Sequence, residues 1–221
     1  MSEPRANPPS PPVTSLKGAD HVLAPLLDRF STAELTEPAP QGAVLEAVLT
    51  TALRAPDHGH LQPWRLVVVQ GGERAELAAA SDAAIARTMA GAPASKRQKW
   101  RERLLKAPMV LALGWAPQEG RIPEDEQLLS VGAGAMNLLN ALFMTGYGGQ
   151  WVSGPWCQDA GLCRALNVPA LVGLMLVGTP TVEARQRGLR KLRTAPKDFI
   201  QYGLNPAIPN KTTQTSKGVP A

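Results

Sequence analysis

Apolar positions along this chain recur first with the period of a helix and then in short unbroken runs. Helical spacing predicts helices over 20–29, 41–54, 75–90, 96–105, 124–145 and 158–166. Between them lie continuous apolar runs, which predict strands buried on both faces over 66–69, 109–115 and 171–178. Because helices and strands alternate, the pattern predicts an α/β or an α+β fold.

The predicted helix over 124–145 is apolar nearly all the way round, from Leu128 to Met144. A helix that is apolar on every side is buried. We therefore expect a central helix or one half of a dimer interface. Gly132, Gly134 and Ala135 would let another backbone approach it closely.

The length of 221 residues and a hydrophobic content of 44% suit one domain with a real core. Both ends of the chain are polar and rich in proline, so they cannot bury enough surface to fold. We expect a disordered tail over 1–16, one domain over 17–205 and a flexible tail over 206–221.

Targeting and redox signals indicate a cytoplasmic protein. No charged segment followed by an apolar one begins the chain, and the longest apolar stretch is shorter than a membrane span. Cys157 and Cys163 form neither a C-x-x-C motif nor a disulfide framework, so we expect two reduced thiols.

The net charge of +5 suits either nucleic acid or a phosphorylated small molecule. The basic residues gather in two clusters, over 96–106 and 185–197, and the simplest interpretation of each is a solvated helix face or loop. Aromatic content is 5%, no recognition motif is present and the clusters lie far apart. We therefore expect no nucleic-acid partner.

Several familiar motifs are missing from the sequence. It contains no phosphate-binding P-loop, no G-x-G-x-x-G after a strand and no G-x-S-x-G elbow. His58 and His60 could begin a metal site, but no third ligand of suitable type is nearby, so we expect no metal.

The segment over 54–64 is unusually rich in hydrogen-bonding side chains for a loop that enters a strand, which is how binding sites are commonly built. Within it, Arg54 and His58 could reach one ligand, or they could pair with Asp57. Arg29 and Ser31 could hold a phosphate, or Arg29 could satisfy the last carbonyls of its helix.

A glycine-rich turn over 146–154 is the remaining candidate. Glycine has no Cβ, so this turn could bring backbone N–H groups close to a flat ring. It could equally be an ordinary tight connection.

Taken together and in this order, these pieces resemble the nitroreductase family over residues 18–203, and most of all its compact subgroup of NAD(P)H nitroreductases. The motifs that carry the resemblance are Arg29-x-Ser31, Arg54-Ala-Pro-Asp-His58 with Gln62-Pro-Trp64, the helix over 127–137, the turn over 146–154 and the segment over 173–180. The Arg-Ala-Pro-Asp-His and Gln-Pro-Trp block is the most specific of them.

The resemblance implies an α+β, nitroreductase-like fold, with a central, mostly antiparallel sheet flanked by helices, in an interlocked homodimer. Two FMN molecules would lie at the subunit interface, with no metal and no catalytic side chain, because flavin carries the redox chemistry. The implied cofactor-binding residues are Arg29, Phe30 and Ser31 from one subunit, Arg54 and His58 from the other, Trp151, Val152 and Ser153 along the isoalloxazine, and Arg193 near the phosphate.

The implied activity is an FMN-dependent oxidoreductase that takes hydride from NADH or NADPH. It would reduce a small electron-poor acceptor, such as a nitroaromatic or a quinone, by a ping-pong mechanism. Fold does not determine reaction, so a dehydrogenase, a flavin-modifying enzyme or a non-catalytic flavin or nucleic-acid binder stay as alternatives. Phe30, Glu34 and Val152 depart from the family pattern, and each departure removes positive charge near the cofactor.

Overall fold

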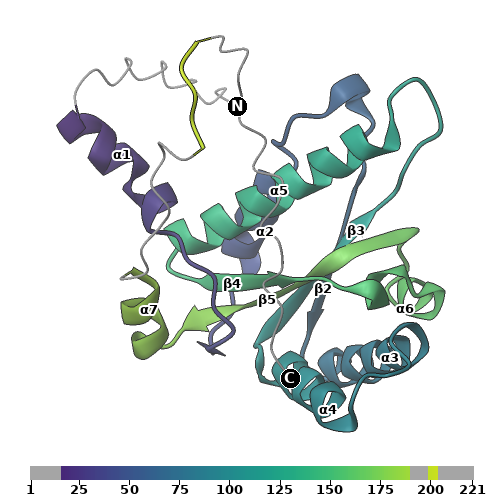
Figure 1. Cartoon of the computed structure of the whole chain (residues 1–221). Helices are drawn as coiled ribbons and strands as arrows, with labels where there is room; N and C mark the ends of the chain where they lie inside the picture. Colours follow the sequence, from purple (N-terminus) through teal and green to yellow (C-terminus); the bar gives the residue numbers. More distant parts are fainter. Residues whose placement is uncertain (1–15, 190–198, 204–221) are drawn as a thin grey trace, which may run out of the picture. The chain divides into compact units, whose positions relative to one another are not determined.

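The computed structural model describes residues 16–189 and 199–203 (Figure 1). Arg193 and most of the two expected tails lie outside these residues, so their predictions stay predictions. Within the described residues, the domain contains helices and one sheet whose strands come from distant parts of the sequence.

The sheet is antiparallel at every pairing between the described strands, which confirms the expected α+β class. Its strand order is β1-β5-β3-β2, and β4 also pairs with β5. The strands are β1 (Leu35–Thr36), β2 (Trp64–Gln70), β3 (Met109–Trp115), β4 (Gly148–Val152) and β5 (Ala170–Pro180).

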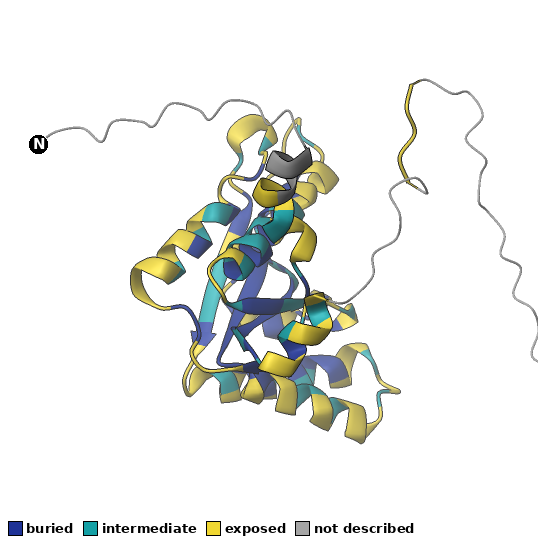
Figure 2. Cartoon of the chain, turned by 90° about the vertical axis from the view of Figure 1, so that its left-hand side faces the viewer, coloured by how far each residue is buried: buried dark blue, intermediate teal, exposed yellow. Residues whose placement is uncertain are grey.

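The two faces of the sheet are covered by different helices, because side chains alternate along each strand. On β3, Met109, Leu111 and Leu113 pack with α2 (Gly42–Ala52) and α5 (Glu124–Met144). Val110 and Ala112 face a second core with α3 (Glu73–Thr88), α4 (Ala94–Lys106) and α6 (Ala160–Ala165). Buried residues accordingly run through the strands between these helices (Figure 2).

The strand β2 is less buried than its sequence predicts. Leu66, Val67 and Val68 are only half-buried, whereas β3 is buried along almost its whole length. The reason is that β2 lies at the edge of the sheet, where β3 is its one neighbour among the described strands. The prediction of burial on both faces is therefore wrong for β2 and confirmed for β3.

The long helix α5 is buried on one side only. Leu138 and Leu142 are buried in the core, whereas Leu129 is 72% and Met144 is 64% exposed. Among the described helices, α5 alone has the length and apolar composition of a membrane span, yet its inner side packs on the sheet as a core helix does. Gly134 packs against the indole of Trp64, while no atom lies within contact of a Cβ built on Gly132.

The helix α1 (Leu16–Asp28) contacts α5. The predicted apolar stripe of α1 is present but largely uncovered, since Val22, Leu23, Leu26 and Leu27 are all exposed. We expect α5 to be either a central helix or one half of a dimer interface, and its exposed apolar side agrees with the second.

Five short elements lie outside the predicted pattern. These are the strands β1 and β4, the 3₁₀ turns η1 (His58–His60) and η2 (Pro155–Gln158), and the helix α7 (Val182–Leu189). The other helix and strand boundaries agree with the predictions to within a few residues.

Candidate functional site

The loop over 54–64 is held by Asp57, which does not pair with its charged neighbours. The Asp57 carboxylate accepts hydrogen bonds from the backbone N–H of Leu61 at 3.1 Å and of Gln62 at 2.8 Å. These bonds support a tight path in which Gly59, His60 and Gln62 all have positive φ. The expected alternative, in which Asp57 pairs with Arg54 or His58, is wrong.

The tryptophan of the Gln-Pro-Trp motif is structural. Trp64 is buried, and its indole N–H donates to the backbone oxygen of Ser130 on α5 at 3.0 Å. It packs with Ala55 and Val131 in a small cluster of its own. The motif therefore fixes the loop to the first half of α5.

His58 and Arg54 are exposed, as are His60 and Gln62 of the same loop. His58 Nδ1 lies 2.8 Å from Glu126 Oε2, at the start of α5, and both side chains face solvent. Arg54 has no side-chain hydrogen bond or ion pair among the described residues. Both are therefore available to a ligand or to a second protein chain.

The other half of the predicted site lies where α1 ends. Arg29 Nη1 lies 3.4 Å from Ser31 Oγ, and Ser31 is exposed. Phe30 points inward, and its ring meets the Phe143 ring edge-on with centroids 5.8 Å apart. Of the three expected cofactor contacts, Phe30 is buried in the structure, so its side chain anchors the segment.

These two halves are held near opposite ends of α5. His58 is bound to Glu126 near the beginning of α5, and Phe30 packs on Phe143 near its end. At about 1.5 Å of rise per residue, the stretch of helix between positions 126 and 143 spans about 25 Å. Figure 1 shows α1 and α7 at one end of α5, away from the loop that enters its other end from β3. One chain does not bring Arg29 and His58 together.

The segment over 29–32 is instead joined to β4. The backbone N–H of Thr32 donates to the oxygen of Gly149 at 3.3 Å. Glu34, one of the departures from the family pattern, forms an ion pair with Arg187 on α7. The negative charge that Glu34 introduces is therefore neutralised inside the chain.

The glycines within and just after β4 serve packing inside the chain. A Cβ on Gly148 would lie 2.5 Å from Pro180, and one on Gly154 would lie 2.7 Å from the Trp156 indole. A Cβ on Gly149 would lie 3.0 Å from the backbone oxygen of Leu176. The close approach needed at these positions is to the chain itself, which favours the tight-connection interpretation.

The three predicted ring contacts follow along β4 and differ in exposure. Ser153 is exposed, while Trp151 and Val152 are half-buried and pack on opposite cores. Val152 and Ser153 line a cavity of about 350 Å³ between β4, η2 and α4. Its wall on α4 contains four cations, Lys96, Arg97, Lys99 and Arg103, and its lining also includes Trp100 and Trp156.

Two ion pairs and one hydrogen bond fix α4 beside this cavity. Arg97 donates to both carboxylate oxygens of Asp82 on α3, at 2.7 and 2.8 Å, and these bonds lower the pKa of Asp82 below its usual value. Arg101 lies 3.9 Å from the same carboxylate. Arg103 donates to Gln150 Oε1 on β4 at 2.7 Å, so α4 and β4 are directly linked.

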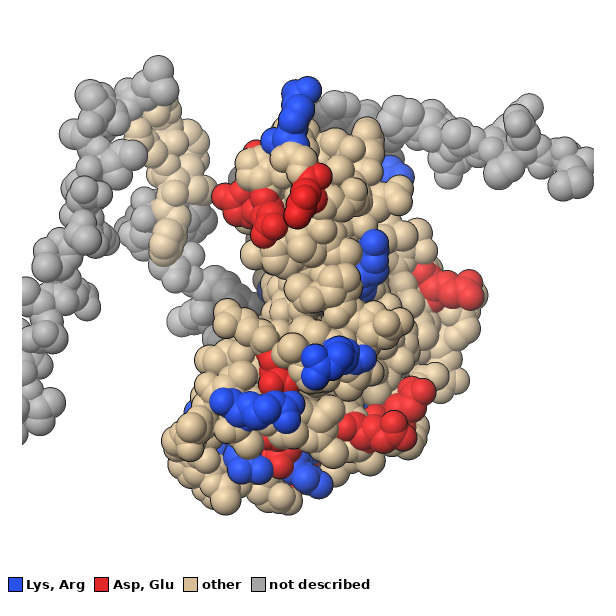
Figure 3. Space-filling model, turned by 90° about the vertical axis from the view of Figure 1, so that its right-hand side faces the viewer, with Lys and Arg blue, Asp and Glu red and all other residues tan. Residues whose placement is uncertain are grey.

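The sequence interpretation missed this wall, because it took the cluster over 96–106 for a solvated helix face. Part of it is solvated. Figure 3 shows basic side chains beside acidic ones on the lower part of the face where α3, α4 and α6 lie. The signal that could have revealed the cavity is Trp100, an aromatic residue placed between Lys99 and Arg101 on the same helix.

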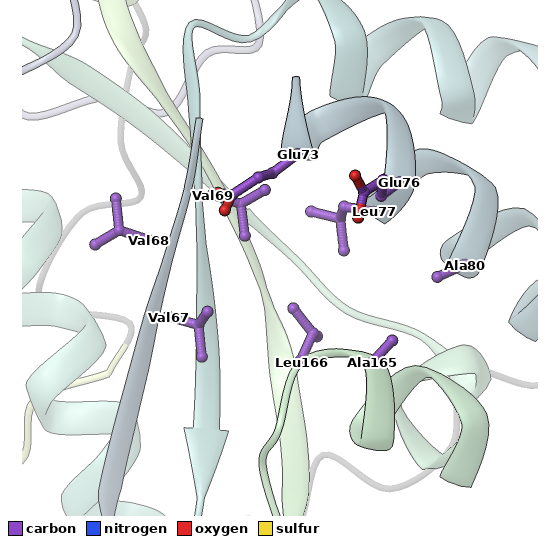
Figure 4. A pocket seen from close by; sticks show the side chains of 9 residues that line it. All are labelled: Val67, Val68, Val69, Glu73, Glu76, Leu77, Ala80, Ala165 and Leu166. Carbon is purple, nitrogen blue, oxygen red and sulfur yellow. The ribbon is translucent and has the colours of Figure 1, made fainter. Parts of the chain in front are cut away.

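A second cavity, of about 230 Å³, lies between β2, α3 and α6 (Figure 4). Its lining is apolar apart from Glu73 and Glu76, and it contains no cation. Two carboxylates repel a phosphate, so this cavity does not suit a phosphorylated cofactor.

The model of the family described as "Nitroreductase family" matches residues 26–179. The chain belongs to the nitroreductase family. It is thus a member of a family of oxidoreductase enzymes.

Individual relatives agree with this family membership. The Escherichia coli K12 protein named "Putative NAD(P)H nitroreductase YdjA" is 34% identical over 166 residues, which cover 72% of this chain and 88% of that protein. A nitroreductase-like family protein from Bacillus cereus has the same fold, with a TM-score of 0.68 at 20% identity, over 89% of this chain and 100% of that chain.

The name of one similar solved structure includes its cofactor and its bound nucleotide. The FMN-dependent nitroreductase NfnB from Mycobacterium smegmatis, in complex with NADPH, matches with a TM-score of 0.65 at 17% identity. The match covers 84% of this chain and 99% of that chain, and shows a shared fold.

Arg29 beside the exposed Ser31 hydroxyl suits the phosphate of a flavin, whereas the α4–β4 cavity suits a smaller aromatic anion. The cavity combines cations and indole rings, which suit a planar ring system and an anion. The indole nitrogen of Trp100 is buried there and has no hydrogen-bond partner in the described part of the chain. Among residues 16–189 and 199–203, no group of three potential ligands could hold a metal ion.

Proposed function

We propose that this nitroreductase-family chain is an FMN-dependent oxidoreductase that takes hydride from NADH or NADPH and reduces a small electron-poor acceptor, such as a nitroaromatic or a quinone. The family membership and the names of its relatives support this proposal. The buried, unpaired Cys157 and Cys163 agree with a reducing compartment, and we place the protein in the cytoplasm.

We further propose that the working unit is a homodimer whose two FMN sites are each shared between subunits. The observation that carries this proposal is the separation of the two site halves along α5, by about 25 Å in one chain. A second copy, related by two-fold symmetry, would place its own Arg54 and His58 against Arg29 and Ser31. The exposed apolar residues of α1 and α5 would then be covered.

In this arrangement each named residue has a distinct task. Arg29 and Ser31 would hold the phosphate end of FMN, and Phe30 would keep that segment in place through Phe143. Arg193, outside the described residues, would add a phosphate contact. The remaining contacts would come from Trp151, Val152 and Ser153 along the ring, and from Arg54 and His58 of the partner subunit.

When bound, FMN supplies two-electron transfer from the nicotinamide to the acceptor. The nicotinamide and the acceptor would use the site in turn, in a ping-pong sequence. For a nitro compound, the hydride of NAD(P)H and one proton from solvent convert the nitro group into a nitroso group and water, leaving NAD(P)⁺. No side chain of this chain needs to act as an acid or a base. Its residues bind, orient and exclude water.

The visible absorption spectrum of the purified protein, before and after anaerobic NADPH or NADH, tests this proposal. We expect a flavin band that either nucleotide bleaches and that an added nitroaromatic restores. A flavin band that neither nucleotide bleaches would indicate a different flavoenzyme reaction on the same fold. No flavin, even after reconstitution with FMN, would refute the proposed function.

A further inference from the structure

More basic residues line the cavity between α4 and β4 than are needed to hold α4 in place. Four basic residues line it and no aspartate or glutamate does. Two of the four are already engaged, since Arg97 is paired with Asp82 and Arg103 donates to Gln150. The charge of Arg97 is therefore compensated within the chain.

Lys96 and Lys99 are the two cations without a partner. Neither lysine side chain makes a hydrogen bond or an ion pair within the described part of the chain. They are three residues apart on α4, so they lie on one side of the helix, at the same cavity. Two adjacent uncompensated ammonium groups attract an anion, and no acidic side chain of the cavity supplies one.

The aromatic part of the cavity lies beside these cations. The rings of Trp100 and Trp156 have centroids 5.4 Å apart at 38°, and Met89 and Ile85 complete an apolar wall. A flat aromatic ring can stack against this wall, because indole rings pair well with other aromatic rings.

We propose that this cavity selects aromatic acceptors that carry an anionic group, a carboxylate or a sulfonate. The ring would lie against Trp100 and Trp156, and the anion would face Lys96 and Lys99. The volume of about 350 Å³ is at the small end for ligand sites, and it suits a one-ring compound better than a dinucleotide. The reduction of such an acceptor rests on the proposed function, whereas its binding does not.

The test compares 4-nitrobenzoate with its neutral counterpart, 4-nitrobenzamide, on the full-length, FMN-loaded protein. Quenching of tryptophan fluorescence in the oxidised protein, without nucleotide, measures the binding of each compound. Steady-state turnover with NADPH then gives kcat/KM for each. We expect the wild-type protein to prefer the benzoate in both measurements, and added salt to reduce the preference.

Replacing both lysines (Lys96→Gln with Lys99→Gln) should lower the benzoate-to-benzamide ratio about three- to tenfold, the effect of removing two exposed ion pairs. The matched control is Lys106→Gln, which removes one charge from an exposed position of α4 that does not line the cavity. That variant should keep the wild-type ratio.

Three results would overturn the inference. They are an equal loss of affinity for both compounds in the double variant, the same change of ratio in Lys106→Gln, or a change confined to the preference between NADPH and NADH. The last would assign the lysines to the donor. Failure of the proposed function is seen separately, as absence of turnover with 4-nitrobenzamide, and leaves the binding measurement to decide the inference.

Discussion

The separation of the two site halves leads to a complementation experiment. In a symmetric dimer with shared sites, Arg29 of one subunit and His58 of the other serve the same FMN. We consider Arg29→Ala in one variant, and Arg54→Ala with His58→Ala in a second. Each variant alone should bind FMN about 10- to 100-fold more weakly, because it lacks charge-assisted contacts to the cofactor at both sites.

The mixture of the two variants gives a different result. A heterodimer has one site that carries all the substitutions and one site that carries none. If subunits exchange at random, half of the dimers are heterodimers, so about a quarter of all sites are intact. We expect that fraction to bind FMN with wild-type affinity and to bleach with NADPH.

The assay is an FMN titration, followed by flavin fluorescence, on proteins mixed after partial unfolding and refolded together. Each variant refolded alone is the control. If the mixture binds FMN no better than the average of the two variants, each site is built from one chain. The reasoning from the length of α5 would then be refuted.

Three further predictions concern stability and reactivity. Asp159→Asn should destabilise the fold by about 1–2 kcal/mol in a thermal melt, because Asp159 accepts two hydrogen bonds from Arg87. Arg87 lowers the pKa of Asp159, so this stability is present above the unfolded pKa and is lost as the pH falls below about 4; a melt whose midpoint does not fall in acid contradicts it. Gly188→Ala should cost about 1–3 kcal/mol, because its Cβ would lie 2.2 Å from the Phe30 ring, and an unchanged melt would contradict that contact. Burial raises the pKa of both cysteine thiols, so they should react with a disulfide reagent at pH 8 slowly in the native protein and quickly in denaturant.

Local sequence patterns predicted the helices and strands that are stabilised by one buried apolar stripe or one buried apolar run. The spacing over 41–54 and 124–145 and the run over 109–115 correspond closely to α2, α5 and β3. The two residues of β1 carry no local signal, because they become a strand only by pairing with Thr179 and Pro180, far along the chain. The edge position of β2 is likewise a property of the sheet order and cannot be seen in its sequence.

The sequence names candidate site residues but not their geometry, and their roles stay predictions. The motif over 54–64 identified an important loop, but its aspartate and tryptophan hold the loop and do not face a ligand. The partner of His58 is Glu126, far away in the sequence, and only tertiary structure brings them together. The α4 wall was overlooked because a basic amphipathic helix looks the same whether its cations face water or a cavity.

The position of His58 and Phe30 at the two ends of α5 also affects how the protein responds to dilution. If each cofactor is held by two chains, loss of FMN and separation of the subunits belong to one linked equilibrium. Cofactor content should then depend on protein concentration as well as on FMN concentration, and excess FMN should hold the dimer together. Activity per molecule would fall on dilution. Added FMN would lower the protein concentration at which this fall occurs.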